Sequence, residues 1–167
     1  PRGQVGGSIG ALCAVLLIIA PGDVGAASAN WTGGGGDALW SNTSNWSATP
    51  VPGLGDTATF NDAAGAGGAT ISLNAIQVRN ITFDTSSVAA YTLGSGVVGN
   101  QTFTLGDGAN AGAITVNSGV TQNQLINAAL TLGDSRVAAT YSLVNESSRD
   151  LTLPGLIRGY NVSGSGN

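Results

Sequence analysis

The chain of 167 residues contains no lysine, no histidine and no methionine, and only 8% of its residues are charged. Its five basic residues are all arginines, and its formal net charge is −4. A nucleic-acid-binding surface needs clustered positive charge against the phosphates, so we exclude that class of protein. The same shortage argues against binding of the mature segment to anionic membranes. Without histidine there is neither a Ser-His-Asp triad nor a histidine-ligated metal site.

Cysteine and aromatic residues are also scarce. Cys13 is the one cysteine, and aromatic residues make up 5% of the chain. Because Cys13 lies in an apolar amino-terminal run, we expect no disulfide and no cysteine-based metal site in the mature region. What the chain does have is glycine, with 27 residues, and a hydrophobic fraction of 42%. This composition favours short, closely stacked strands over disorder.

Residues 1–29 have the layout of a secretory signal peptide. Arg2 precedes a short apolar run, Ile9–Ala20, and Ala27-Ser28-Ala29 supplies the small residues of a cleavage site after Ala29. The run is shorter than the roughly 20 residues of a spanning helix. The alternative, a buried helix, lacks a second helical segment to pack against. We therefore expect a secreted or cell-surface protein, associated with the outer membrane in its full-length form.

Residues 30–70 form a segment rich in tryptophan and glycine. All three tryptophans, Trp31, Trp40 and Trp46, lie here among glycine- and proline-containing turns. They are the large apolar groups near this end of the chain, so we expect them to cap a core of smaller side chains.

Residues 71–167 repeat a triplet of an apolar residue, Thr or Ser, and a second apolar residue. Alternation with period two places the outer residues of a triplet on one face of a strand and the Thr or Ser on the other. Gly, Asn or Asp commonly follows, which predicts turns. The best helical candidate is Gln122–Leu130, which is short. The triplets are Ile71-Ser72-Leu73, Ile81-Thr82-Phe83, Tyr91-Thr92-Leu93, Phe103-Thr104-Leu105, Ile114-Thr115-Val116, Leu130-Thr131-Leu132, Tyr141-Ser142-Leu143 and Leu151-Thr152-Leu153.

Short strands at near-even spacing predict an all-β fold with two possible architectures. Uniform triplets, small side chains and matching Thr, Ser and Asn positions favour a parallel β-helix whose coils stack in register. The drift in spacing leaves an antiparallel β-sandwich as the alternative. Since no closing element precedes Asn167, we expect the repeats to be truncated, with any anchor lying in the missing carboxyl-terminal segment.

The opening segment carries a resemblance. The pattern Trp31-x-Gly-Gly-Gly-Gly-Asp37-x-x-Trp40, then Asn45-Trp46, then Val51-Pro52-x-x-Gly55-Asp56-x-Ala58-x-Phe60 resembles the amino-terminal region of bacterial proteins with autotransporter-associated β-strand repeats. Ile81-Thr82-Phe83-Asp84 is similar to their first repeat strand. The resemblance implies an exported, right-handed parallel β-helix, as in an autotransporter passenger. It supplies no catalytic residues, and the Gly-Gly-Thr-rich repeats typical of that family are not clear in this chain.

Three sets of residues are candidate sites. Asp107 and Asp134 each follow a Leu-Gly pair and could approach one another as a carboxylate pair, although Gly-Asp is ordinary turn chemistry. Gly33–Asp37 is similar to a calcium-binding turn but occurs once, so we interpret it as a flexible turn. The tryptophans, with Tyr91, Tyr141 and Tyr160, could form a sugar-stacking platform, although core and cap packing is the favoured interpretation.

The sequence therefore predicts an exported structural or adhesive surface protein with no catalytic activity of its own. We assign no catalytic, cofactor-binding or metal-binding residue and expect no cofactor. The expected partners are an extracellular polysaccharide or the surface of a host or neighbouring cell. The alternative is a carbohydrate-active module, either a polysaccharide-binding domain or a β-helical lyase that would use the arginines to neutralise an acidic sugar.

Overall fold

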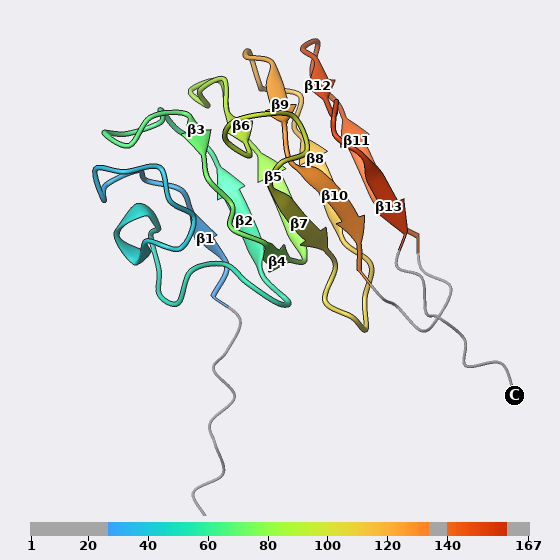
Figure 1. Ribbon diagram of the computed structural model, residues 1–167. Coiled ribbons are helices and arrows are strands. Elements are labelled where there is room, and N and C mark those ends of the chain that lie inside the picture. The colour runs from blue at the N-terminus through green and yellow to red at the C-terminus, as the bar shows by residue number, and fades with distance from the viewer. Residues whose placement is uncertain (1–26, 134–139, 160–167) are drawn as a thin grey trace, which may run out of the picture.

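The computed structural model describes residues 27–133 and 140–159. It is a parallel β-solenoid with three sheets, and its coils are stacked from the amino-terminal to the carboxyl-terminal end (Figure 1). The first sheet contains β1 (Ala29–Asn30), β2 (Thr57–Phe60), β5 (Asn80–Phe83), β8 (Ala113–Val116) and β11 (Ser142–Asn145). The second contains β3 (Thr70–Ile71), β6 (Thr92–Leu93), β9 (Gln124–Ile126) and β12 (Leu151–Thr152). The third contains β4 (Ile76–Val78), β7 (Thr102–Leu105), β10 (Ala129–Leu132) and β13 (Ile157–Gly159).

The chain visits the three sheets in the same order in each coil. Equivalent places in the first sheet are one full coil apart in the chain, as shown by the in-register series Thr57, Asn80, Ala113 and Ser142. All pairings between the named strands are parallel, and the one antiparallel bridge found in the described chain joins Trp31 to Trp46. The predicted parallel β-helix is thus confirmed, and the sandwich alternative is wrong.

Apolar and polar residues alternate along the strands, and the apolar ones form the core. In β5, Ile81 and Phe83 are fully buried whereas Thr82 lies on the outer face, and β2 and β8 repeat this pattern. In the third sheet, Phe103 lies in register between Ile76 and Leu130. Each coil therefore contributes a layer of apolar side chains that covers the layer before it, as expected when a single coil cannot bury its own apolar face.

The spacing of the triplets is explained by the three sheets. The short step between successive triplets carries the chain from one sheet to another, so a triplet does not stack on the triplet that follows it in the sequence. Ile81 instead stacks on Ile114, one full coil later. The segment Gln122–Leu130 is not helical, since it contains β9 and the start of β10.

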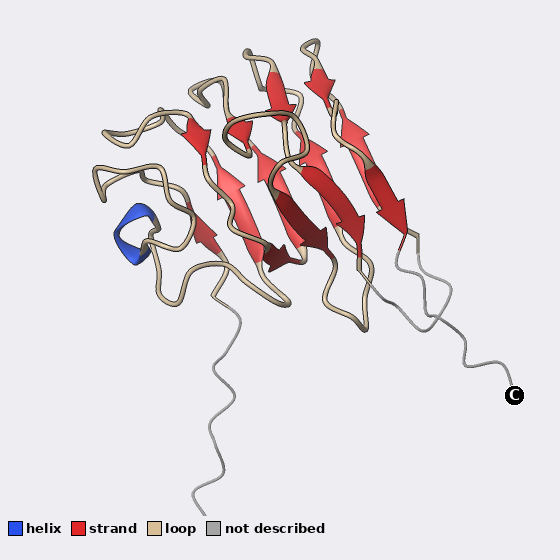
Figure 2. Cartoon of the chain, in the orientation of Figure 1, coloured by secondary structure: helices blue, strands red, loops and turns tan. Residues whose placement is uncertain are grey.

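The amino-terminal end of the solenoid is closed by the tryptophan-rich cap. Trp46 makes edge-on contacts with Trp31 and Trp40, at ring-centroid distances of 5.1 and 4.7 Å. The indole N–H of Trp40 donates to the Pro52 carbonyl, and that of Trp46 donates to the Trp40 carbonyl. The short 3-10 helix η1 (Thr43–Asn45) lies in this cap and is the one helical element of the described chain (Figure 2). The expected cap is confirmed, and the same segment also supplies β2 to the first sheet.

Residues 1–26, which carry the apolar run of the expected signal peptide, lie outside the described residues. Ala29, the residue after which cleavage is expected, is buried in β1 and pairs with Ala58. The hydroxyl oxygen of Ser28 accepts the N–H of Thr57. Cleavage after Ala29 would remove these contacts. Within the described ranges there is no helix with the length and apolarity needed to cross a membrane.

Candidate functional site

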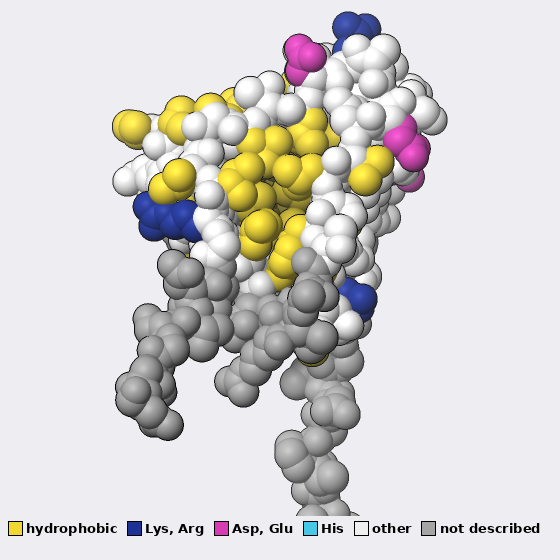
Figure 3. Space-filling model, turned by 90° about the vertical axis from the view of Figure 1, so that its right-hand side faces the viewer, with side chains coloured by type: hydrophobic (Ala, Val, Ile, Leu, Met, Phe, Trp, Pro, Cys, Tyr) yellow, Lys and Arg dark blue, Asp and Glu magenta, His cyan; other side chains and the backbone are white. Residues whose placement is uncertain are grey.

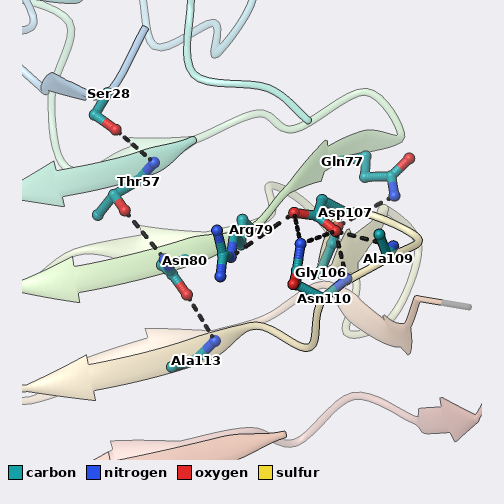
Figure 4. A network of polar contacts seen from close by, with 10 residues as sticks. All are labelled: Ser28, Thr57, Gln77, Arg79, Asn80, Gly106, Asp107, Ala109, Asn110 and Ala113. Carbon is teal, nitrogen blue, oxygen red and sulfur yellow. Dashed lines mark hydrogen bonds and ion pairs between the residues drawn. The ribbon is translucent and has the colours of Figure 1, made fainter. Parts of the chain in front are cut away.

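Asp107 lies in the turn after β7 and is the centre of a polar network (Figure 4). Its carboxylate accepts hydrogen bonds from the backbone N–H groups of Ala109 and Asn110, and from the Asn110 amide. The Arg79 Nε lies 3.8 Å from its Oδ2, which forms the one ion pair seen within the described ranges. These internal donors occupy both carboxylate oxygens. The favoured interpretation of Asp107 as a turn residue therefore agrees with its contacts, and the Arg79 partner was not predicted.

The second carboxylate of the candidate pair, Asp134, lies outside the described residues, as does Arg136. The three arginines of the described chain lie in two regions of the solenoid. Arg79 lies between β4 and β5, Arg149 precedes β12, and Arg158 lies in β13. The structure thus brings Arg79 to Asp107 and places Arg149 and Arg158 in the last coil.

The Asp107 network makes stability depend on pH. Burial raises the pKa of Asp107, but the bonds from Asn110 and Ala109, together with the Arg79 charge, outweigh it and hold the pKa below its usual value. A lowered pKa in the folded state gives stability that is present above the unfolded pKa of about 4 and is lost as pH falls through the folded pKa. Asp107→Asn should therefore be less stable than the wild type at pH 7 and equally stable at the lowest pH. Urea unfolding of both proteins over the acid range tests this expectation, and an unchanged difference between them would contradict it.

The Gly33–Asp37 turn is occupied by the protein's own donors. The Asp37 carboxylate accepts hydrogen bonds from the Leu39 backbone N–H and from the amides of Asn42 and Asn45. These bonds lower the pKa of Asp37. Asn45 is fully buried, and its side-chain oxygen accepts the N–H of Gly35. The segment is therefore a turn, as interpreted from the sequence, but hydrogen bonds to Asp37 and Asn45 hold it in place, in contrast to the flexibility expected from its glycines. No group of three or more potential metal-ligating side chains occurs in the described part of the chain.

The aromatic side chains contribute mostly to the core. Trp31 and Trp40 are 1% exposed and Trp46 is 5% exposed, so the three indoles offer no stacking surface to a sugar. Tyr91 is equally buried, and its hydroxyl donates to the carbonyls of Asp62 and Ala63. Burial, with a smaller effect of the Asp62 charge, raises the pKa of Tyr91 to about 12. The Tyr141 hydroxyl donates to the Gly133 carbonyl, and Tyr160 lies outside the described residues. The favoured interpretation of the tryptophans as cap and core residues is confirmed.

Side-chain amides connect successive coils, in keeping with the matching Asn positions that favoured stacking, although Asn80 and Gln124 were not named for this role. At the start of the first sheet, the Asn80 amide donates to the Thr57 hydroxyl, and its oxygen accepts the N–H of Ala113 (Figure 4). At the second sheet, the buried Gln124 amide accepts the N–H of Tyr91 and donates to the Ala89 carbonyl. The sequence feature that could have indicated this role is the position of each amide, directly before an apolar residue of a strand.

The outer face of the first sheet presents a column of threonines. Thr59, Thr82 and Thr115 lie in register on β2, β5 and β8. All three are partly exposed, whereas the residues on either side of each are buried. The backbone of each strand is fixed by pairing with its neighbours, so the hydroxyls are held at the spacing of the strands, about 4.8 Å. The flank of the first sheet is therefore a regular array of hydrogen-bonding side chains.

The last described coil is less buried than the coils before it. Leu143 stacks on the fully buried Ile114, yet it is 47% exposed. Ile157 stacks on the buried Leu130 and is 46% exposed. Seen from this side, apolar side chains gather near the centre of the described surface, with polar and charged groups beside and above them (Figure 3).

Comparison with family models, with curated proteins and with solved structures found no match for this chain.

Proposed function

We propose that this chain is part of an exported surface scaffold that is structural or adhesive and has no catalytic activity of its own. The observation that carries the proposal is the threonine column on the stacked first sheet. The predicted signal peptide and the resemblance to autotransporter-associated repeat proteins support export. The internal hydrogen bonds that occupy the carboxylates of Asp37 and Asp107 support a structural use of these acids rather than acid–base chemistry.

The proposed partner is an extracellular polysaccharide or the carbohydrate-rich surface of a neighbouring or host cell. Threonine hydroxyls both donate and accept hydrogen bonds, and so they match sugar hydroxyls in chemistry. A column of such groups on the outer face of a sheet supports weak binding at each site. Useful affinity then requires many copies acting together on one surface.

The test uses beads coated with the full chain and measures their retention on polysaccharide layers and on cells. The triple variant Thr59→Val, Thr82→Val, Thr115→Val removes three hydroxyls while keeping the β-branched shape. At roughly 1 kcal/mol for each hydrogen bond, we expect retention to fall about tenfold or more. The matched control is Thr104→Val, Thr131→Val, which changes the outward column of the third sheet. Equal retention of the two variants, or no retention of the wild type on any surface, would contradict the adhesive function.

A further inference from the structure

Ser28 and Ala29 belong to the folded solenoid, although the expected signal peptide extends to Ala29. Ala29 is 4% exposed and is part of the buried core. It pairs in parallel register with Ala58 on β2, and Ala58 pairs in turn with Ile81 on β5. Both Ala58 and Ile81 are fully buried. Ala29 therefore holds the first position of a core column that the later coils continue.

Ser28 likewise begins a column of polar contacts between coils (Figure 4). Its hydroxyl oxygen accepts the backbone N–H of Thr57 in the next coil. Further along this column, the side-chain oxygen of Asn80 accepts the backbone N–H of Ala113. Because Thr57 and Asn80 lie in register, Ser28 holds the place in the first coil that Asn80 holds two coils later.

Cleavage after Ala29 would leave the first coil incomplete. The product would begin at Asn30, so its charged amino group would lie in β1 itself, one residue before the buried Trp31. It would also lack the apolar side chain that pairs with Ala58 and the acceptor for the N–H of Thr57. Loss of a buried apolar group and loss of a hydrogen bond each lower the stability of the folded product.

The sequence directly upstream of Ser28 offers other cleavage sites. A signal peptidase reads small residues one and three positions before the bond that it cuts. Gly25-Ala26-Ala27 supplies them for a cut between Ala27 and Ser28, and Val24-Gly25-Ala26 supplies a compact pair for a cut one residue earlier. Both cuts leave β1 whole, whereas the cut after Ala29 divides it.

We propose that the exported protein is cut upstream of Ser28, at the Ala27–Ser28 bond or the Ala26–Ala27 bond, so that β1 stays with the mature chain. Hydrolysis of the bond consumes one water and leaves a carboxylate on the signal peptide and an amino group on the mature chain. Ser28 is exposed, so the new amino group remains in water and outside the strand. This inference rests on the export proposed above, which supplies the peptidase.

The amino terminus of the exported protein tests the proposal. The full chain is produced in a bacterial host, recovered from outside the cytoplasm and analysed by intact mass and amino-terminal sequencing. We expect the mature chain to begin at Ala27 or Ser28. A chain that begins at Ala29 or Asn30 overturns the inference and leaves export in place. A chain that keeps its signal peptide and stays in the cytoplasm overturns the proposed export, and this inference with it.

A double variant separates the candidate cuts. Gly25→Leu, Ala26→Leu removes the small residues that the two upstream cuts require and keeps Ala27-Ser28-Ala29 for the cut after Ala29. We expect the products that begin at Ala27 and Ser28 to be lost. The matched control Gly6→Leu, Gly7→Leu makes the same changes before the apolar run and should be cut at the wild-type position. Equal processing of the two double variants would contradict the proposal.

Unfolding of the two mature forms tests the physical reason. Chains that begin at Ala27 and at Asn30, both ending at Asn167, are compared by urea unfolding followed by tryptophan fluorescence. We expect the equilibrium constant for unfolding to be about tenfold larger for the shorter chain, the scale of one hydrogen bond and one buried methyl group. Ser28→Ala in the longer chain removes only the bond to Thr57 and should give an intermediate value. Equal stability of the two chains would overturn the role given to Ser28 and Ala29.

Discussion

Replacing Phe60 with alanine is expected to lower the free energy of unfolding by about 3–5 kcal/mol, the range for a large aromatic side chain removed from a packed core. Phe60 is fully buried at the end of β2 and joins the cap to the first complete coil. Its ring contacts all three tryptophans, with centroid distances of 6.0 to 6.3 Å. On the other side it stacks on Phe83 at 5.3 Å and contacts Tyr91 at 4.9 Å.

The measurement is urea unfolding followed by tryptophan fluorescence, because every tryptophan contacts the substituted ring. Phe60→Leu keeps part of the apolar volume and should show a smaller loss. The control Leu54→Ala changes a cap-segment residue that is 60% exposed and should have little effect. If Phe60→Ala is no less stable than Leu54→Ala, the cap is not coupled to the coils through this residue.

Gly112→Ala is expected to destabilise the central coils by about 3 kcal/mol or more, at the upper end of the range for overpacking substitutions. A Cβ at Gly112 would lie 2.0 Å from the carbonyl oxygen of Arg79, in the coil beneath. It would also lie 2.8 Å from the Gly106 nitrogen. Both atoms belong to the backbone, so no change of rotamer relieves the clash, and the coils themselves must separate.

Because each coil contacts mainly its neighbours, the damage should be local. Hydrogen exchange should show protection lost from β8 onward, while the cap and β2 stay protected. Gly119→Ala is the matched control, since a Cβ there has its nearest neighbours at 3.9 Å, an ordinary contact. Uniform loss of protection along the chain, or equal behaviour of the two variants, would contradict this expectation.

Several strands were not predicted from the sequence, and the reason lies in the triplet pattern used to find them. The triplet pattern required Thr or Ser in the middle, yet this position faces outward and accepts other polar residues. Gln77 occupies it in β4 and Arg158 in β13, and both strands were missed. In β9 the inward-facing first position holds Gln124, which is buried and hydrogen-bonded to the adjacent coil. β4 also follows two residues with positive φ, Asn74 and Ala75, a turn that the sequence pattern did not reveal.

The polar contacts also divide into those that the sequence indicates and those that only the structure reveals. The turn role of Asp107 follows from its place after a Leu-Gly pair, because its partners Ala109 and Asn110 are two and three residues away. Its ion pair with Arg79 joins adjacent coils of the solenoid, and only the stacking of coils brings the two side chains together. The bonds of Asn80 and Gln124 likewise connect residues in adjacent coils.

The sequence by itself determined the features that depend on neighbouring residues: β-strands with one apolar and one polar face, glycine- and aspartate-containing turns, and a group of tryptophans suited to a cap. Alternation and turn chemistry are local properties, so a linear pattern contains them. Only the tertiary structure decided which strand pairs with which, that each coil contributes strands to three sheets, and that the tryptophan-rich segment covers the first coil. These features depend on contacts between residues a full coil apart in the chain, and the uneven length of the connecting turns hides that period from the sequence.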